Sequence, residues 1–66
     1  MNSDQKYLMA QFQTLVRELA DAAIRLAKAR RDKNPGMIVA TLDEIRDYSN
    51  ALLQLEEANA KLASEE

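Results

Sequence analysis

Residues 29–39, ARRDKNPGMIV, hold the only proline and the only glycine of a 66-residue chain. The segments on either side are rich in Ala, Leu, Gln, Glu, Lys and Arg, which favour the α-helix, whereas proline and glycine interrupt it. Asn34 followed by Pro35 suits an N-cap and a first helical position, because proline lacks only an N–H that is unpaired there. We interpret Pro35 and Gly36 as the residues that reverse the chain. The sequence therefore predicts one domain with a helix over about 3–31, a turn over about 32–35 and a helix over about 35–63.

Apolar residues recur every three or four positions in both segments, which places them on one face of each helix. In the first segment Met9, Val16 and Ala23 widen this stripe on one side. A short turn makes the helices antiparallel neighbours, so residue i of the first lies roughly level with residue 67 − i of the second. The predicted core of the hairpin or dimer consists of Leu8, Phe12, Leu15, Leu19, Leu26, Ile38, Ile45, Tyr48, Leu52 and Leu55.

A chain of this length buries a small fraction of its surface and normally relies on disulfides, a metal ion or another subunit. The sequence has neither cysteine nor histidine, which removes disulfides and the usual zinc and iron–sulfur ligands. Self-association is the remedy that is left. We therefore expect an all-α antiparallel two-helix hairpin that dimerises into a four-helix bundle.

Residues that commonly carry catalysis are also missing. The usual pairs of nucleophile and base include a histidine or a cysteine, and Gly36 stands alone where a phosphate-binding loop needs several glycines. Asp43 and Asp47 lie one helical turn apart in DEIRD, but Arg46 stands beside them, and we interpret this cluster as a solvated charged face. We expect no enzyme activity, no cofactor and no bound metal.

Positive charge gathers directly before the turn. Residues 25–33 hold five cations and one acid, a net +4, whereas the rest of the chain carries −6. Cations near a helix C-terminus interact favourably with the helix dipole, which is the structural interpretation of this cluster. An acidic protein surface and the phosphates of a nucleic acid are the two binding interpretations, although no aromatic residue stands among the cations to stack on bases. A head-to-tail dimer would instead place the basic turn of one hairpin against the acidic C-terminal region of the other.

Two apolar residues fall outside the main stripes and close to the basic turn. An apolar patch ringed by arginines has the composition of a protein-binding hot spot. The predicted partner-binding residues are Ile24, Arg25, Lys28, Arg31 and Val39.

The functional hypothesis is a non-enzymatic homodimer that binds another protein with an acidic surface and modulates it. It would be an inhibitor, anti-activator or adaptor of the kind that phages and plasmids encode. The layout is similar in architecture to the small plasmid-encoded Rop hairpins and to several type III secretion co-chaperones. The alternatives are accordingly a Rop-like nucleic-acid-binding bundle and a structural or co-chaperone subunit. The chain lacks the roughly 20-residue apolar run of a membrane span and the pattern of a signal peptide, which indicates a cytoplasmic protein with its native start.

Overall fold

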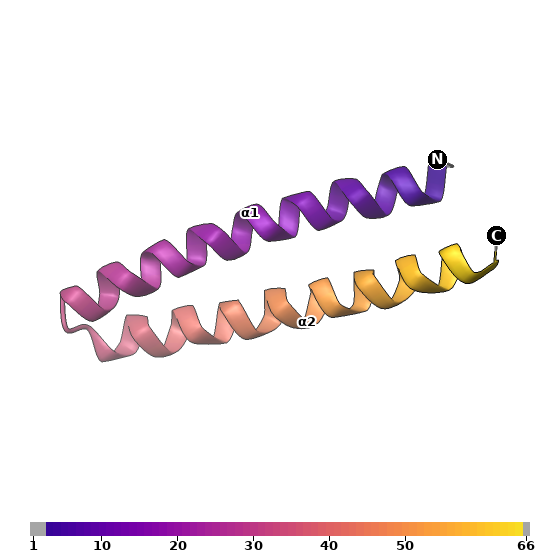
Figure 1. Cartoon of the computed structure of the whole chain (residues 1–66). Helices are drawn as coiled ribbons and strands as arrows, with labels where there is room; N and C mark the ends of the chain where they lie inside the picture. The colour runs from indigo at the N-terminus through magenta and orange to yellow at the C-terminus, as the bar shows by residue number, and fades with distance from the viewer. Residues whose placement is uncertain (1–2, 66) are drawn as a thin grey trace.

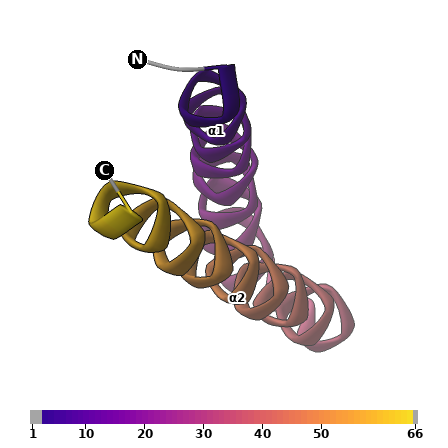
Figure 2. The ribbon, with the colours of Figure 1, turned by 90° about the vertical axis from the view of Figure 1, so that its right-hand side faces the viewer.

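The computed structural model describes residues 3–65 and contains two α-helices joined by a short turn (Figure 1). Helix α1 spans Ser3–Arg31 and helix α2 spans Pro35–Glu65. The helices pack side by side in opposite directions, and the hairpin measures 50 by 14 by 10 Å between Cα positions (Figures 1 and 2). The predicted all-α architecture, with two helices packed against each other, is confirmed.

Asn34 caps the beginning of α2. Its side-chain Oδ1 accepts a hydrogen bond from the backbone N–H of Met37 at 3.1 Å, and its carbonyl accepts one from the N–H of Ile38 at 3.0 Å. Pro35 and Gly36 occupy the first two positions of the helix. The predicted N-cap is therefore confirmed, and it satisfies a backbone donor that no helical carbonyl can reach.

The reversal of the chain is made by a lysine. Lys33 has a φ of 54°, in the left-handed region, whereas Gly36 has no positive φ and lies inside α2. The N–H of Lys33 donates to the carbonyl of Arg30 at 3.1 Å, and the N–H of Asn34 donates to the carbonyl of Ala29 at 3.0 Å. This pair of bonds is a Schellman motif, which satisfies the last carbonyls of a helix. The interpretation that the proline and the glycine make the reversal is therefore wrong.

Full burial is confined to small residues in the half of the hairpin next to the turn. Ala22, Ala29 and Thr41 are at most 4% exposed. The hydroxyl of Thr41 donates to the carbonyl of Met37 at 2.6 Å, so its polar group is satisfied between the helices. Small side chains let the helices approach closely here, and the ribbons draw apart toward their free ends (Figure 1).

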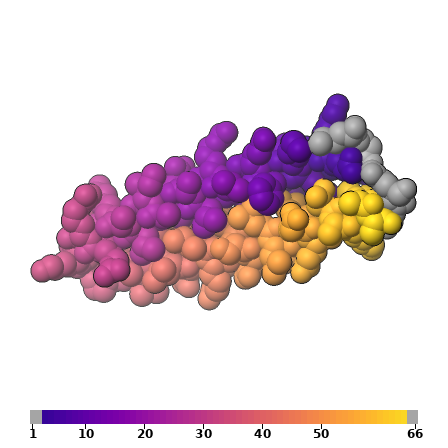
Figure 3. Space-filling model, in the orientation of Figure 1, coloured from indigo at the N-terminus to yellow at the C-terminus, as the bar shows by residue number. Residues whose placement is uncertain are grey.

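The large apolar residues of the stripes are only partly covered. Of the predicted core residues, Phe12 is 40% exposed and the others are half-buried. Side chains of the two helices touch along the hairpin in the space-filling view (Figure 3), but each helix has only one neighbour. The hairpin by itself therefore has a thin core.

Two substitutions at the turn should stabilise the chain. Lys33→Gly should raise the free energy of unfolding by about 1 kcal/mol, because glycine adopts the left-handed conformation without strain. Gly36→Ala should raise it by about 0.5–1 kcal/mol, since alanine favours the helix and its Cβ would meet only Asn34 Oδ1, at 3.8 Å. Chemical denaturation measures both changes. Arg31→Gly, the control inside α1, should destabilise the chain, and a stabilising Lys33→Val would contradict the assigned turn.

Candidate functional site

The basic residues before the turn have different surroundings in the folded hairpin. Arg25 Nη2 lies 2.7 Å from Glu44 Oε2, and this ion pair joins α1 to α2. The other cations of the segment are exposed; they are Lys28, Arg30, Arg31 and Lys33. The predicted cluster therefore divides into one cation that pairs with α2 and four that extend into solvent.

The ion pair shifts the pKa values of both partners in the direction that favours their charged forms. The hydrogen bond from Arg25 lowers the pKa of the Glu44 carboxyl below its ordinary value, and the same bond raises the pKa of Arg25. Both side chains are close to half exposed, so solvent screens their attraction. The pair thus helps to align the two helices, and its contribution to stability is modest.

Glu44→Gln should lower the melting temperature slightly at neutral pH, because it removes the charge that Arg25 faces. The difference in melting temperature between variant and wild type should be largest above the ordinary carboxyl pKa of about 4.3. It should vanish as the pH falls through the lower pKa of folded Glu44. Below that pKa the wild-type side chain is also uncharged. Thermal unfolding followed by circular dichroism across this pH range measures the effect. Glu57→Gln is the control, and an equal pH-dependent loss in that variant would contradict the assignment to the Arg25 pair.

The carboxylates of the DEIRD segment are engaged by arginines. Arg46 lies 3.6 Å from Asp43 through Nη2 and 3.6 Å from Asp47 through Nε, and all three side chains are more than half exposed. Glu44 faces Arg25 instead. Within residues 3–65, no group of three or more His, Cys, Asp or Glu side chains is arranged to hold a metal ion. The cluster is a set of long, solvated ion pairs on the surface of α2.

Folding also changes how charge is distributed along the molecule. The ion pair places Glu44 beside Arg25, six residues before the end of α1, and Asp43 and Asp47 lie within one turn of Glu44. Acidic residues of α2 therefore offset part of the positive charge that stands before the turn. The excess that is left lies at residues 28–33, where four cations and one acid give +3. We call these residues the basic tip.

The residues predicted to bind a partner lie on different sides of the hairpin. Ile24, Lys28 and Arg31 follow each other at spacings of four and three, so they share one face of α1, which we call the outer α1 face. Ile24 is 69% exposed on this face. Arg25 faces α2, and Val39 is 60% exposed on the outer side of α2. The structure thus brings three of the five together, and a ligand that also touched Val39 would have to span the turn.

A second apolar surface lies on another side of the hairpin. Its most exposed large side chains are Met9, Phe12, Val16, Leu42 and Leu53, each between 40% and 57% exposed. We call this surface, which both helices contribute to, the apolar face.

The Arg25–Glu44 pair marks the opposite side of the hairpin from the apolar face. Ala23 stands two residues before Arg25, and Leu42 stands two residues before Glu44. Two residues turn a helix by about 200°, so Ala23 and Leu42 point away from the ion pair. Ala23 in turn shares its side of α1 with Val16, seven residues earlier. The apolar stripes of both helices therefore widen toward the same side, away from the ion pair.

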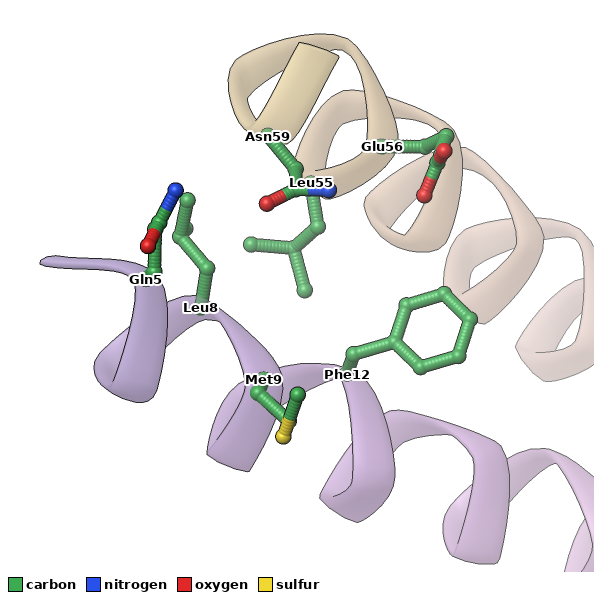
Figure 4. Close-up of a pocket in the computed structure, with 7 residues that line it drawn as sticks. All are labelled: Gln5, Leu8, Met9, Phe12, Leu55, Glu56 and Asn59. Atoms are coloured by element: carbon green, nitrogen blue, oxygen red, sulfur yellow. The ribbon is translucent and has the colours of Figure 1, made fainter. Parts of the chain in front are cut away.

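The apolar face is hollowed at the open end of the hairpin, between the first turns of α1 and the last turns of α2 (Figure 4). The hollow has a volume of about 320 Å³. Leu8 and Leu55 extend toward each other between the helices, and the ring of Phe12 reaches from α1 toward α2 (Figure 4). The lining residues are Gln5, Leu8, Met9, Phe12, Leu55, Glu56 and Asn59. Its mainly apolar lining suits an apolar side chain from another molecule.

Reasoning from sequence missed the cross-helix role of Arg25 and the free apolar face. The first had a signal, because the expected register places Arg25 within one helical turn of Glu44. The free apolar face had a partial signal, because Met9, Val16 and Ala23 widen the stripe of α1 on one side. The width of a stripe tells how much of a helix is apolar but not which part of it the neighbouring helix covers.

Searches of protein-family models, curated proteins and solved structures return no match to this chain. Neither helix, over the residues that the structure describes, combines the length and the apolar character needed to cross a membrane. The surface of the hairpin is therefore the basis for inferring function.

Proposed function

We propose that the chain is a homodimeric helical hairpin that works by binding another protein, as a regulator without catalytic activity of its own. The observation that supports this best is the contrast between core and surface. The fully buried residues described are small, namely Ala22, Ala29 and Thr41, whereas large apolar side chains such as Phe12 and Leu42 are 40–48% exposed. Such a chain needs another protein surface to cover it.

The total exposed area supports dimerisation. A compact monomeric protein of 7.5 kDa exposes roughly 4,200 Å². The hairpin exposes 5074 Å², which is roughly 800 Å² more. A stable protein interface buries about 800 Å² on each partner. Packing the apolar face against a second copy would remove this excess and form a four-helix bundle, in which the wide stripe of each helix has two neighbours.

The outer α1 face is the surface we assign to the other protein. It points away from α2 and stays accessible when the apolar face is covered. Ile24 supplies an exposed apolar group, and Lys28 and Arg31 follow it on the same stripe, about one and two turns closer to the end of α1. An apolar centre beside cations fits an apolar patch bordered by carboxylates. Arg25 contributes indirectly, because its pair with Glu44 holds α1 in place.

Nucleic acid is a less suitable partner for this face. The sequence has no aromatic residue between positions 13 and 47, so no aromatic side chain near the basic tip can stack on an exposed base. Glu44 and the neighbouring Asp43 and Asp47 also lie beside Arg25, and their charge opposes the approach of a phosphate backbone to that part of α1.

Sedimentation of the wild-type protein at micromolar concentration should give a molecular mass of twice the 7.5 kDa of one chain. Its melting temperature should rise with protein concentration. Phe12→Glu should raise the dissociation constant of the dimer at least about tenfold, because a charge on the apolar face must be desolvated. Ala10→Glu adds the same charge about 200° around α1 and should leave the dimer unchanged. A folded wild-type chain that sediments as a monomer, with a melting temperature independent of concentration, would overturn the proposed dimer.

Lys28→Glu combined with Arg31→Glu should abolish binding to the partner protein while the chain stays folded. The matched control reverses two cations on the other helix, Arg46→Glu with Lys61→Glu. Each form is used as bait in lysate treated with nuclease, the retained proteins are quantified, and binding is then measured with the purified candidate. One protein should be retained by wild type and control and lost from the variant. Equal retention by all three forms contradicts the assigned surface, and binding only before nuclease treatment points to nucleic acid.

A further inference from the structure

We propose that two hairpins pack head to tail through the apolar face, so that the basic tip of each lies beside the open end of the other. This arrangement rests on the proposed dimer and specifies its geometry. It is carried by two independent features of the described residues, the sizes of the side chains along the apolar face and the charges at its two ends.

Side-chain size on the apolar face of α1 decreases from the open end toward the turn. The large residues Met9, Phe12 and Val16 occupy the open half. The exposed positions that continue their spacing of three and four residues are Ala20, Ala23 and Ala27. This side of α1 is therefore a ridge near the chain termini and a shallow groove near the turn.

The order is reversed on α2. Ile38, Leu42 and Ile45 make its turn half large and apolar, and Leu53 lies near the middle of the helix. Ser49, just before Leu53, is small, and the corresponding positions toward the open end, Glu56 and Ala60, are polar or small. The hollow at the open end lies beside this part of α2. Each half of the apolar face thus combines a ridge on one helix with a groove on the other.

Head-to-tail packing places ridges against grooves. Helix α1 is centred near residue 17 and α2 near residue 50. In a head-to-tail dimer, residue i of α1 therefore lies roughly level with residue 35 − i of α1 in the second copy. In the same way, residue j of α2 lies roughly level with residue 100 − j of α2 in the second copy. Phe12 then meets Ala23 of the second copy. The hollow beside Glu56 receives Leu42 and Ile45 of the second copy, which fill it with apolar side chains.

Charge distinguishes this arrangement from one with both turns at the same end. Size alone permits either, because a same-end dimer would set the ridge of α1 on the groove of α2. The basic tip carries +3, whereas the open end, residues 4–8 and 56–65, holds four acids and two cations, a net −2. A same-end dimer brings two basic tips together, and a head-to-tail dimer brings each tip to an acidic end.

The arrangement has a consequence for the proposed partner. The two α1 helices lie next to each other in opposite directions, so both outer α1 faces belong to the same side of the bundle. Lys28 of one copy and Lys28 of the other are then roughly 30 Å apart along the bundle. One dimer therefore offers two separate and equivalent binding surfaces.

A distance measurement between the two turns tests the arrangement directly. The chain has no cysteine, so Asp32→Cys in the full chain carries one spin label per copy. Pulsed electron paramagnetic resonance should give a distance of roughly 45 Å for head-to-tail packing, and less than roughly 25 Å for turns at the same end. The short distance overturns the arrangement and leaves the proposed dimer standing. Absence of dipolar coupling in a sample that sediments as a single chain overturns the dimer and the arrangement together.

Charge reversal at the basic tip provides a second test with opposite outcomes for the two arrangements. Arg30→Glu with Arg31→Glu should raise the dimer dissociation constant at least about threefold at low salt if each tip faces an acidic end, and the effect should shrink at high salt. Adding Glu57→Lys should restore part of the affinity. A lower dissociation constant for the doubly substituted chain, caused by relief of repulsion between adjacent tips, would overturn head-to-tail packing.

Discussion

The constraint on which the rest of this structure depends is that each of two helices has only one neighbour. Among the described residues, burial is most complete at Ala22 and Ala29 of α1 and at Thr41 of α2, which are at most 4% exposed. Larger residues along the same stripes are covered on one flank only. An apolar stripe wide enough for two neighbours is therefore half used by the hairpin, and the unused half becomes the apolar face.

The turn meets a separate requirement, which is to satisfy the backbone groups at two helix ends within three residues. Asn34 does this for α2 through its side chain and contributes its N–H to the end of α1. Lys33 takes the left-handed conformation between them because the Schellman pattern needs it at that position, whatever side chain stands there. The geometry of the reversal is thus set by hydrogen bonding, and the strain at Lys33 follows from it.

The sequence was sufficient to predict the two helices and the N-cap, because Asn34 and Pro35 have strong positional preferences and the apolar spacing is regular. It was insufficient to predict which residue of the turn takes the left-handed conformation and which residues of a stripe the other helix covers. Glycine was expected to make the reversal, yet it lies two residues after the N-cap, inside α2. Phe12 belongs to the same stripe as Leu8, but it stands farther around α1 and is more exposed. Its position relative to α2 depends on the rotation of the helix, which periodicity leaves open.

The cations near the turn show how folding assigns different tasks to residues that are adjacent in the chain. Arg25 is used within the hairpin, since Glu44 approaches it to 2.7 Å. The basic tip lies at the extreme end of the hairpin, where in the proposed bundle the acidic open end of a second copy lies beside it. Lys28 and Arg31 also belong to the outer α1 face, so their charge is shared between the second copy and the partner. Ile24 lies farther from the basic tip, so its apolar contact belongs to partner binding and not to the electrostatics of the dimer. This distance along α1 lets one helix contribute both to the outer α1 face and to the dimer.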